Sequence, residues 1–171
     1  MPGYVIHLAV AQEYLRKNKK QEEYKEFIKG VIYPDSVKDK SLTHYGPKSS
    51  KVDLKKFLEH NNIDNSYQRG YFLHLVTDYL FYNKYLNIFT KDIYDDYDIL
   101  NSGLIQKYNV DVPLEVKDCI FYKEGNTKIL SKKLAEKVIE EVSSLDLDVV
   151  KKEILENPDS EKWSKLNDKI T

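Results

Sequence analysis

The sequence predicts an all-α protein, a single-domain helical bundle. Apolar residues recur at helical spacing along most of the 171-residue chain, and no stretch alternates apolar and polar residues as a strand would. Only six Gly and five Pro residues are present to interrupt helices. Because the length falls within the roughly 100 to 200 residues typical of one domain, we expect a single domain over residues 1–171.

Two helices are predicted near the N-terminus. The first covers about residues 4–16, and the cations of residues 17–20 close it, since positive charge suits a helix C-terminus. The second runs from about Gln21 to Ile32 and is expected to stop at Pro34, because the residue before a proline disfavours the helical conformation. Asp35 would then lie just past the end of this helix.

The strongest helical pattern covers residues 66–86. Its apolar residues lie on more than one side, which is typical of a helix at the centre of a bundle. Gly70, within this pattern, either permits close packing or marks an early turn. Before it, residues 36–52 are interpreted as a loop that carries His44, and a short helix with Leu54, Phe57 and Leu58 on its apolar face follows.

Helices are also expected in the second half of the chain. The pattern predicts two within residues 88–108 and 114–122, one over 127–143 and a short one over 149–155. We therefore expect residues of about 4–85 to form the half that carries the functional site, and residues of about 86–171 to form a helical C-terminal half.

Composition limits the class of partner and the compartment. With 27 basic and 28 acidic residues the net charge is -1, so no general surface for nucleic acid is evident. The single cysteine, Cys119, fits a reducing compartment. The N-terminus lacks the pattern of a secretory signal, and no stretch of about 18 apolar residues exists. We expect a cytoplasmic protein without a transmembrane segment, of undetermined oligomeric state.

Three histidines and two aspartates form the main candidate site: His7, Asp35, His44, His74 and Asp78. Most of them sit among apolar residues, and burying such a group without a partner costs a few kcal/mol, roughly. His74 and Asp78 are four apart, so on a helix they lie one turn apart on the same face. We interpret the five residues as ligands of one metal site.

The donor set indicates the metal and the chemistry. Imidazole nitrogens and carboxylate oxygens suit zinc, and iron or manganese also accept them. Such an ion generates hydroxide near neutral pH and polarises a phosphoryl or carbonyl oxygen, which points to hydrolysis. Asp35 would be either a ligand or the catalytic base that takes a proton from the bound water.

Each residue also has a simpler interpretation. His74 and Asp78 can be a paired core histidine and carboxylate, with His7 and His44 as unrelated surface residues; the joint pattern favours the metal site. His60 is interpreted as a surface residue, and Cys119 as structural or incidental.

Two runs of charge are more often solvated faces than sites. The acidic run over residues 94–98 can lend a carboxylate to a second ion. The lysines Lys48, Lys51, Lys55 and Lys56 can hold an anionic phosphate near the site. For both runs we favour the solvated face.

Four short motifs occur in a fixed order: His7-Leu8-Ala9, Tyr33-Pro34-Asp35, Thr43-His44 and Gly70-Tyr71-x-x-His74-Leu75-x-x-Asp78. This order and spacing resemble the zinc-dependent phospholipase C family, whose all-helical fold is shared with single-strand nucleases. The resemblance covers about residues 4–85. It implies that the matching positions bind zinc and that Asp35 is also a candidate general base. Because no histidine follows His74, it implies a reduced site with one or at most two ions.

The function expected from the sequence is a metal-dependent hydrolase of a phosphoester, with metal-activated water as nucleophile. Its substrate would be a small molecule or a lipid. Two alternatives stay open. One is a non-catalytic, metal-stabilised helical scaffold or partner-binding protein. The other is a helical phosphohydrolase of the HD type, which is disfavoured because the chain has no adjacent His-Asp pair.

Overall fold

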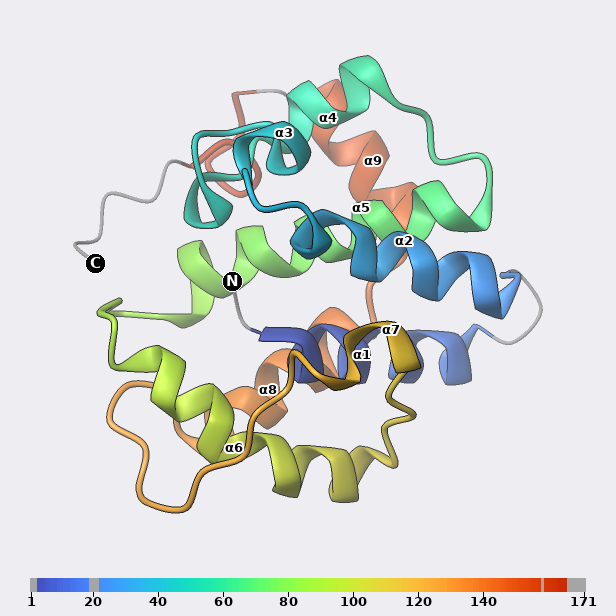
Figure 1. Ribbon diagram of the computed structural model, residues 1–171. Helices are drawn as coiled ribbons and strands as arrows, with labels where there is room; N and C mark the ends of the chain where they lie inside the picture. The colour runs from blue at the N-terminus through green and yellow to red at the C-terminus, as the bar shows by residue number, and fades with distance from the viewer. Residues whose placement is uncertain (1–2, 19–21, 158, 166–171) are drawn as a thin grey trace.

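Nine α-helices build the fold over the residues that the computed structural model describes, which are 3–18, 22–157 and 159–165 (Figure 1). The helices are α1 (Gly3–Lys17), α2 (Tyr24–Ser36), α3 (Ser41–His44), α4 (Leu54–His60), α5 (Ser66–Leu80), α6 (Ile93–Tyr108), α7 (Leu114–Lys117), α8 (Lys132–Val142) and α9 (Leu147–Glu156). A 3-10 turn, η1 (Ser49–Lys51), precedes α4, and a π-helical turn, η2 (Phe81–Tyr85), continues α5. These described ranges contain no strand, so the predicted all-α class is confirmed.

Helix α5 is the central element, as its pattern predicts. Every residue from Gly70 to Leu80 is buried, because α1, α2, α4 and α9 all pack against this helix. Figure 1 shows α5 running across the middle of the molecule with α2 beside it. Near the end of the predicted helix, residues Phe81–Tyr85 depart from α geometry and form η2, a type of turn that is common near functional sites.

Two glycines let α2 and α5 cross backbone to backbone. A Cβ atom added to Gly30 would lie 2.0 Å from the carbonyl oxygen of Tyr67, and one added to Gly70 would lie 2.0 Å from that of Phe27. Both positions therefore require glycine. Gly70 therefore permits close packing, which is the first of the two roles considered for it. The close crossing brings Asp35 on α2 near His74 on α5.

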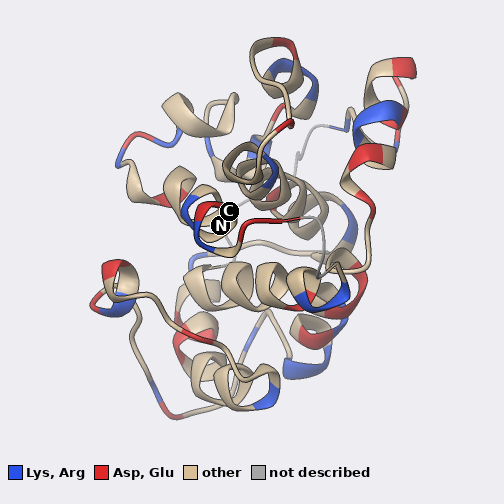
Figure 2. Ribbon diagram, turned by 90° about the vertical axis from the view of Figure 1, so that its right-hand side faces the viewer, with Lys and Arg blue, Asp and Glu red and all other residues tan. Residues whose placement is uncertain are grey.

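The remaining helices enclose this pair. Helices α6 and α8 pack against α1, whereas α9 packs against α4 and α5. Blue and red segments alternate along the outer helices in Figure 2, whereas most of the inner ribbon is tan. None of the helices in the described ranges has both the length and the apolar character needed to cross a membrane.

Helix α2 does not end where the sequence predicts. It continues through Pro34 to Ser36, so Asp35 lies in its last turn and not beyond it; Gln21, the predicted start, lies outside the described residues. Pro34 lacks the N–H that would bond to the carbonyl oxygen four residues earlier, so the helix continues past it without that one bond. The carbonyl groups there find other donors, since the Thr43 hydroxyl donates to Pro34 and the Lys40 ammonium donates to Asp35.

Other boundaries also differ from the prediction. The predicted loop over 36–52 contains α3, and His44 is the last residue of that short helix. The helix predicted over 114–122 ends at Lys117, because the next segment bonds to α6: the Asn101 amide donates to the carbonyl of Phe121. Helix α8 begins at Lys132 and not at residue 127, because the backbone N–H groups of residues 128–130 donate to the Asp96 carboxylate in a bent segment before the helix.

Candidate metal centre

Four helices bring the five predicted ligands together. His7 comes from α1, Asp35 from α2, His44 from α3, and His74 and Asp78 from one face of α5. All five are buried: the exposed fraction is 0% for His44 and Asp78, and the largest value of the five is 7%, for Asp35. Two overlapping groups, His7 with Asp35 and His74, and His44 with His74 and Asp78, each have donor atoms within 4.8 Å of one another.

Hydrogen bonds on the outer side of two imidazoles fix their orientation. The Nδ1 of His74 donates to the carbonyl oxygen of Val31 at 2.7 Å, and the Nδ1 of His44 donates to that of Lys40 at 3.1 Å. Because a carbonyl oxygen can only accept, Nδ1 carries the proton in both rings and Nε2 of the neutral ring presents a lone pair. This arrangement is typical of histidines that bind metals.

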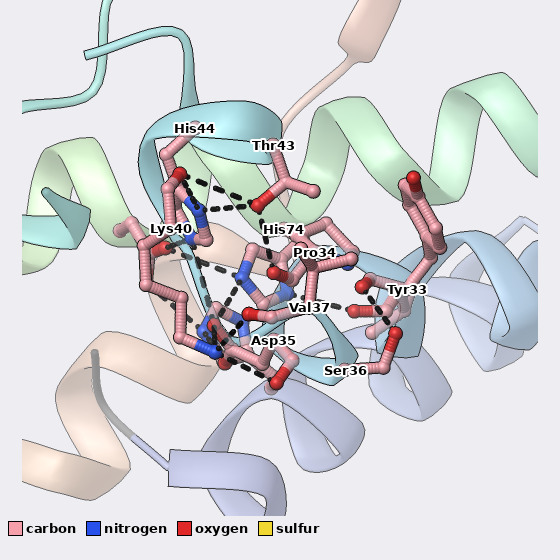
Figure 3. A network of polar contacts seen from close by, with 12 residues as sticks. Tyr33, Pro34, Asp35, Ser36, Val37, Lys40, Thr43, His44 and His74 are labelled. Atoms are coloured by element: carbon pink, nitrogen blue, oxygen red, sulfur yellow. Dashed lines mark hydrogen bonds and ion pairs between the residues drawn. The ribbon is translucent and has the colours of Figure 1, made fainter. Parts of the chain in front are cut away.

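Both lone pairs face carboxylate oxygens. Asp78 Oδ2 lies 3.0 Å from His44 Nε2 and 3.2 Å from His74 Nε2. Asp35 Oδ1 lies 3.5 Å from each of these nitrogens (Figure 3). These four buried atoms have no hydrogen-bond partner by distance and angle. Acceptors that face one another in a buried place need a positive charge between them, which is either protons on the rings or a metal ion.

The spacing of the four atoms fits a metal ion. Zinc binds imidazole nitrogen and carboxylate oxygen at about 2.0 to 2.2 Å, so neighbouring donors of a tetrahedral site lie about 3.3 Å apart. The four nitrogen-to-oxygen separations, from 3.0 to 3.5 Å, lie close to this value. His44, His74 and Asp78 therefore form a group of three donors that could hold an ion, and Asp35 Oδ1 lies 3.5 Å from both imidazole nitrogens of this group.

His7 approaches the same carboxylates from another side. Its Nε2 lies 2.9 Å from Asp78 Oδ1 and 3.9 Å from Asp35 Oδ2, and its ring stacks on that of His74 with 3.6 Å between centroids. A hydrogen bond to Asp78 Oδ1 orients that carboxylate. The buried Nδ1 of His7 has no hydrogen-bond partner. His7 thus contacts the ligand set and stays a predicted ligand.

The charges in the cluster shift the pKa values of its members strongly. Burial lowers the pKa of His74, but the charges of Asp35 and Asp78 outweigh burial and raise it to about 10. Burial also lowers the pKa of His44, yet the carboxylates of Asp35 and Asp78 that face its Nε2 outweigh burial and raise this pKa. Burial and the neighbouring His74 lower the pKa of His7. The facing imidazoles overcome burial and hold the pKa values of Asp35 and Asp78 below their usual range.

Other residues singled out in the sequence lie outside this cluster. His60 and Cys119 are exposed, as expected. Of the lysines, Lys51 and Lys56 line a shallow hollow beside Gly46, and Lys48 and Lys55 are exposed.

One residue of the acidic run contradicts the expectation of a solvated face. Asp96 is buried, and its carboxylate accepts the N–H groups of Lys128, Ile129 and Leu130 at 2.7 to 2.9 Å. It therefore anchors the segment that leads into α8.

Sequence reasoning missed Lys40. Its ammonium bonds to the end of α2 and lies 3.9 Å from Asp35 Oδ1, while its carbonyl oxygen orients His44. The spacing contains a signal, since a residue four before a helical histidine can offer its carbonyl to Nδ1. This signal applies only if residues 41–44 form a helix, as they do in the structure. The sequence pattern predicts a loop there, so it does not point to Lys40.

Comparison with known proteins gives no match: no protein-family model matches the chain, and no curated protein or solved structure is significantly similar to it. Fold and site nevertheless define a class, an all-α protein with a buried cluster of three histidines and two aspartates that could hold a metal ion.

Proposed function

We propose that this protein is a metal-dependent hydrolase of phosphoesters that resembles the zinc-dependent phospholipase C family. The observation that carries the proposal is the pair of overlapping groups of three buried donors, His7 with Asp35 and His74, and His44 with His74 and Asp78, each close enough together to hold a metal ion. Structural zinc sites are mostly built from cysteine, whereas catalytic sites use histidine with a carboxylate. Zinc is the proposed ion, and iron or manganese would accept the same donors.

The residues have separate roles in this proposal. His44, His74 and Asp78 would hold the ion, and Asp35 would lie beside it as a further ligand or as the base. When bound, the ion supplies a water of lowered pKa and polarises a phosphoryl oxygen. Asp35 Oδ2 is buried without a hydrogen-bond partner, so it is placed to accept the proton that the attacking water gives up.

The test is the hydrolysis of phosphomonoesters and phosphodiesters, water-soluble and lipid, by zinc-loaded protein. Asp35→Asn removes the proton acceptor but keeps an oxygen for the ion, so the rate should fall by a factor of about 100 to 10,000 while zinc is retained. Asp95→Asn, at an exposed carboxylate, is the matched control and should keep the rate. A zinc-loaded protein that hydrolyses none of these substrates would contradict the proposal, and so would an Asp35→Asn variant with full activity.

A second candidate function is a metal-stabilised scaffold that binds a partner. Its support is the burial of all five cluster residues, because a structural ion is closed off from solvent whereas a catalytic ion keeps a position for water. Cobalt in place of zinc distinguishes the two. A visible spectrum that changes when phosphate is added indicates an open position and the hydrolase, and an unchanged spectrum indicates the scaffold.

A further inference from the structure

Lys40 lies at the solvent edge of the metal centre, between α2 and α3. Its ammonium donates to the carbonyl oxygens of Asp35 at 2.7 Å and Val37 at 3.0 Å, as Figure 3 shows. Its side chain is 26% exposed, while the carboxylate of Asp35 beneath it is fully buried. Lys40 is therefore a charged residue that reaches both solvent and the cluster.

The ammonium is fixed in place but has a donor to spare. A lysine ammonium has three N–H groups, and the two carbonyl oxygens take two of them. The distance of 3.9 Å to Asp35 Oδ1 is too long for a hydrogen bond, so this contact is an ion pair only. One N–H group is thus free for an acceptor beside an atom of the donor set.

The backbone of Lys40 fixes this position relative to the cluster. The carbonyl oxygen of Lys40 accepts from the backbone N–H of His44 at 2.9 Å and from its Nδ1 at 3.1 Å. Lys40 therefore contacts Asp35 through its ammonium and His44 through its carbonyl oxygen.

Charge at the site favours an anion next to Lys40. Two carboxylates bring two negative charges, which one divalent ion balances when the three imidazoles are neutral. The Lys40 ammonium then leaves the site with one positive charge, and its ion pair with Asp35 is weakened because the ion shares that carboxylate. A phosphoryl group has enough oxygen atoms to contact the ion and the ammonium together.

We propose that Lys40 binds a phosphoryl oxygen of the substrate, an inference that rests on the proposed phosphoester hydrolase. The lysines that follow His44 are the less suitable choice. Lys51 and Lys56 line a hollow with Tyr45 and Gly46, and this hollow contains none of the five cluster residues.

Phosphate binding to zinc-loaded protein tests this directly, with inorganic phosphate as the probe and calorimetry as the readout. Lys40→Met and Lys40→Gln should weaken phosphate binding about tenfold or more, the loss expected for one charge-assisted hydrogen bond, while the zinc content stays unchanged. Lys40→Arg should restore most of the affinity because it keeps the charge. Lys48→Met, at an exposed lysine, is the control and should bind as the wild type does.

Three results would overturn the role of Lys40. The first is wild-type protein that binds no phosphate, and the second is unchanged phosphate affinity in the Lys40→Met and Lys40→Gln variants. The third is loss of zinc from both variants, which would show that Lys40 is needed to assemble the metal site. Kinetics separate this proposal from the hydrolase itself. Hydrolysis with an unchanged KM in the Lys40 variants refutes only Lys40, whereas Lys40-dependent phosphate binding without hydrolysis refutes only the enzyme.

Discussion

Asp78 contacts all three imidazoles of the cluster. Its Oδ1 lies 2.9 Å from His7 Nε2, and its Oδ2 lies 3.0 Å from His44 Nε2 and 3.2 Å from His74 Nε2. Asp78 is completely buried in the central helix, so no water replaces a lost contact. At the scale of single residues, this carboxylate is the one on which the cluster depends most.

Asp78→Asn is therefore predicted to abolish tight zinc binding. The substitution keeps the shape of the side chain but removes its charge and replaces one oxygen by a donor that faces an imidazole or the ion. The loss of zinc affinity should exceed the roughly 10- to 100-fold that removal of a metal's outer partner costs. Competition with a chromogenic chelator measures it, and Asp95→Asn serves as the control. Wild-type affinity in Asp78→Asn would show that Asp78 is not a ligand.

At the scale of elements, the crossing of α2 and α5 sets the site. Gly30 and Gly70 let the two backbones touch, and one turn beyond Gly70 the Nδ1 of His74 reaches the carbonyl oxygen of Val31 on α2. A wider crossing would break this bond and move Asp35 away from Asp78. The two glycines thus position cluster residues that they do not contact.

Gly30→Ala and Gly70→Ala are predicted to destabilise the fold. Each new methyl group would lie 2.0 Å from a backbone carbonyl oxygen of the other helix, so the helices must separate, at a cost of about 1 to 3 kcal/mol or more in the free energy of unfolding. Gly103→Ala is the matched control, because its Cβ would meet only the end of Lys132 at 4.0 Å. It should gain up to about 1 kcal/mol from helix propensity. Chemical denaturation measures all three, and equal stabilities would refute the tight crossing.

Element boundaries show what the sequence can and cannot predict. Apolar spacing predicts the existence of α1, α5, α8 and α9, because each must bury one or more faces. Their ends depend on distant partners. Thr43 and Lys40 donate hydrogen bonds to the last carbonyl groups of α2, and Asp96 accepts hydrogen bonds from the residues just before α8. The local sequence pattern predicts none of these contacts.

The same reasoning applies to the site. Imidazoles and carboxylates stand out in an apolar sequence, so the five cluster residues could be predicted from their types and spacing. Lys40 could not, because lysine is common at surfaces and its role depends on where α2 ends. The roles of Asp35 and His7 also depend on distances that no spacing rule supplies.

At the scale of the whole molecule, the cluster joins helices that are far apart in the sequence. Side chains from α1, α2, α3 and α5 meet in it, so an ion held there would join elements that are far apart in the sequence. An ion that binds only the folded state stabilises it by about 2.7 kcal/mol at a free concentration 100 times Kd. For a chain of this size, that corresponds to a rise of roughly 5 to 10 °C in Tm.

Elemental analysis of protein purified without chelator or affinity metal tests the metal centre most directly. We predict one zinc ion per chain, lost on dialysis against a strong chelator and regained on adding zinc, with Tm falling and recovering in step. The Asp78→Asn variant should carry none. Wild-type protein that contains no zinc, iron or manganese, and whose Tm none of these ions raises, would contradict the account and leave the cluster as a network of protonated histidines and carboxylates.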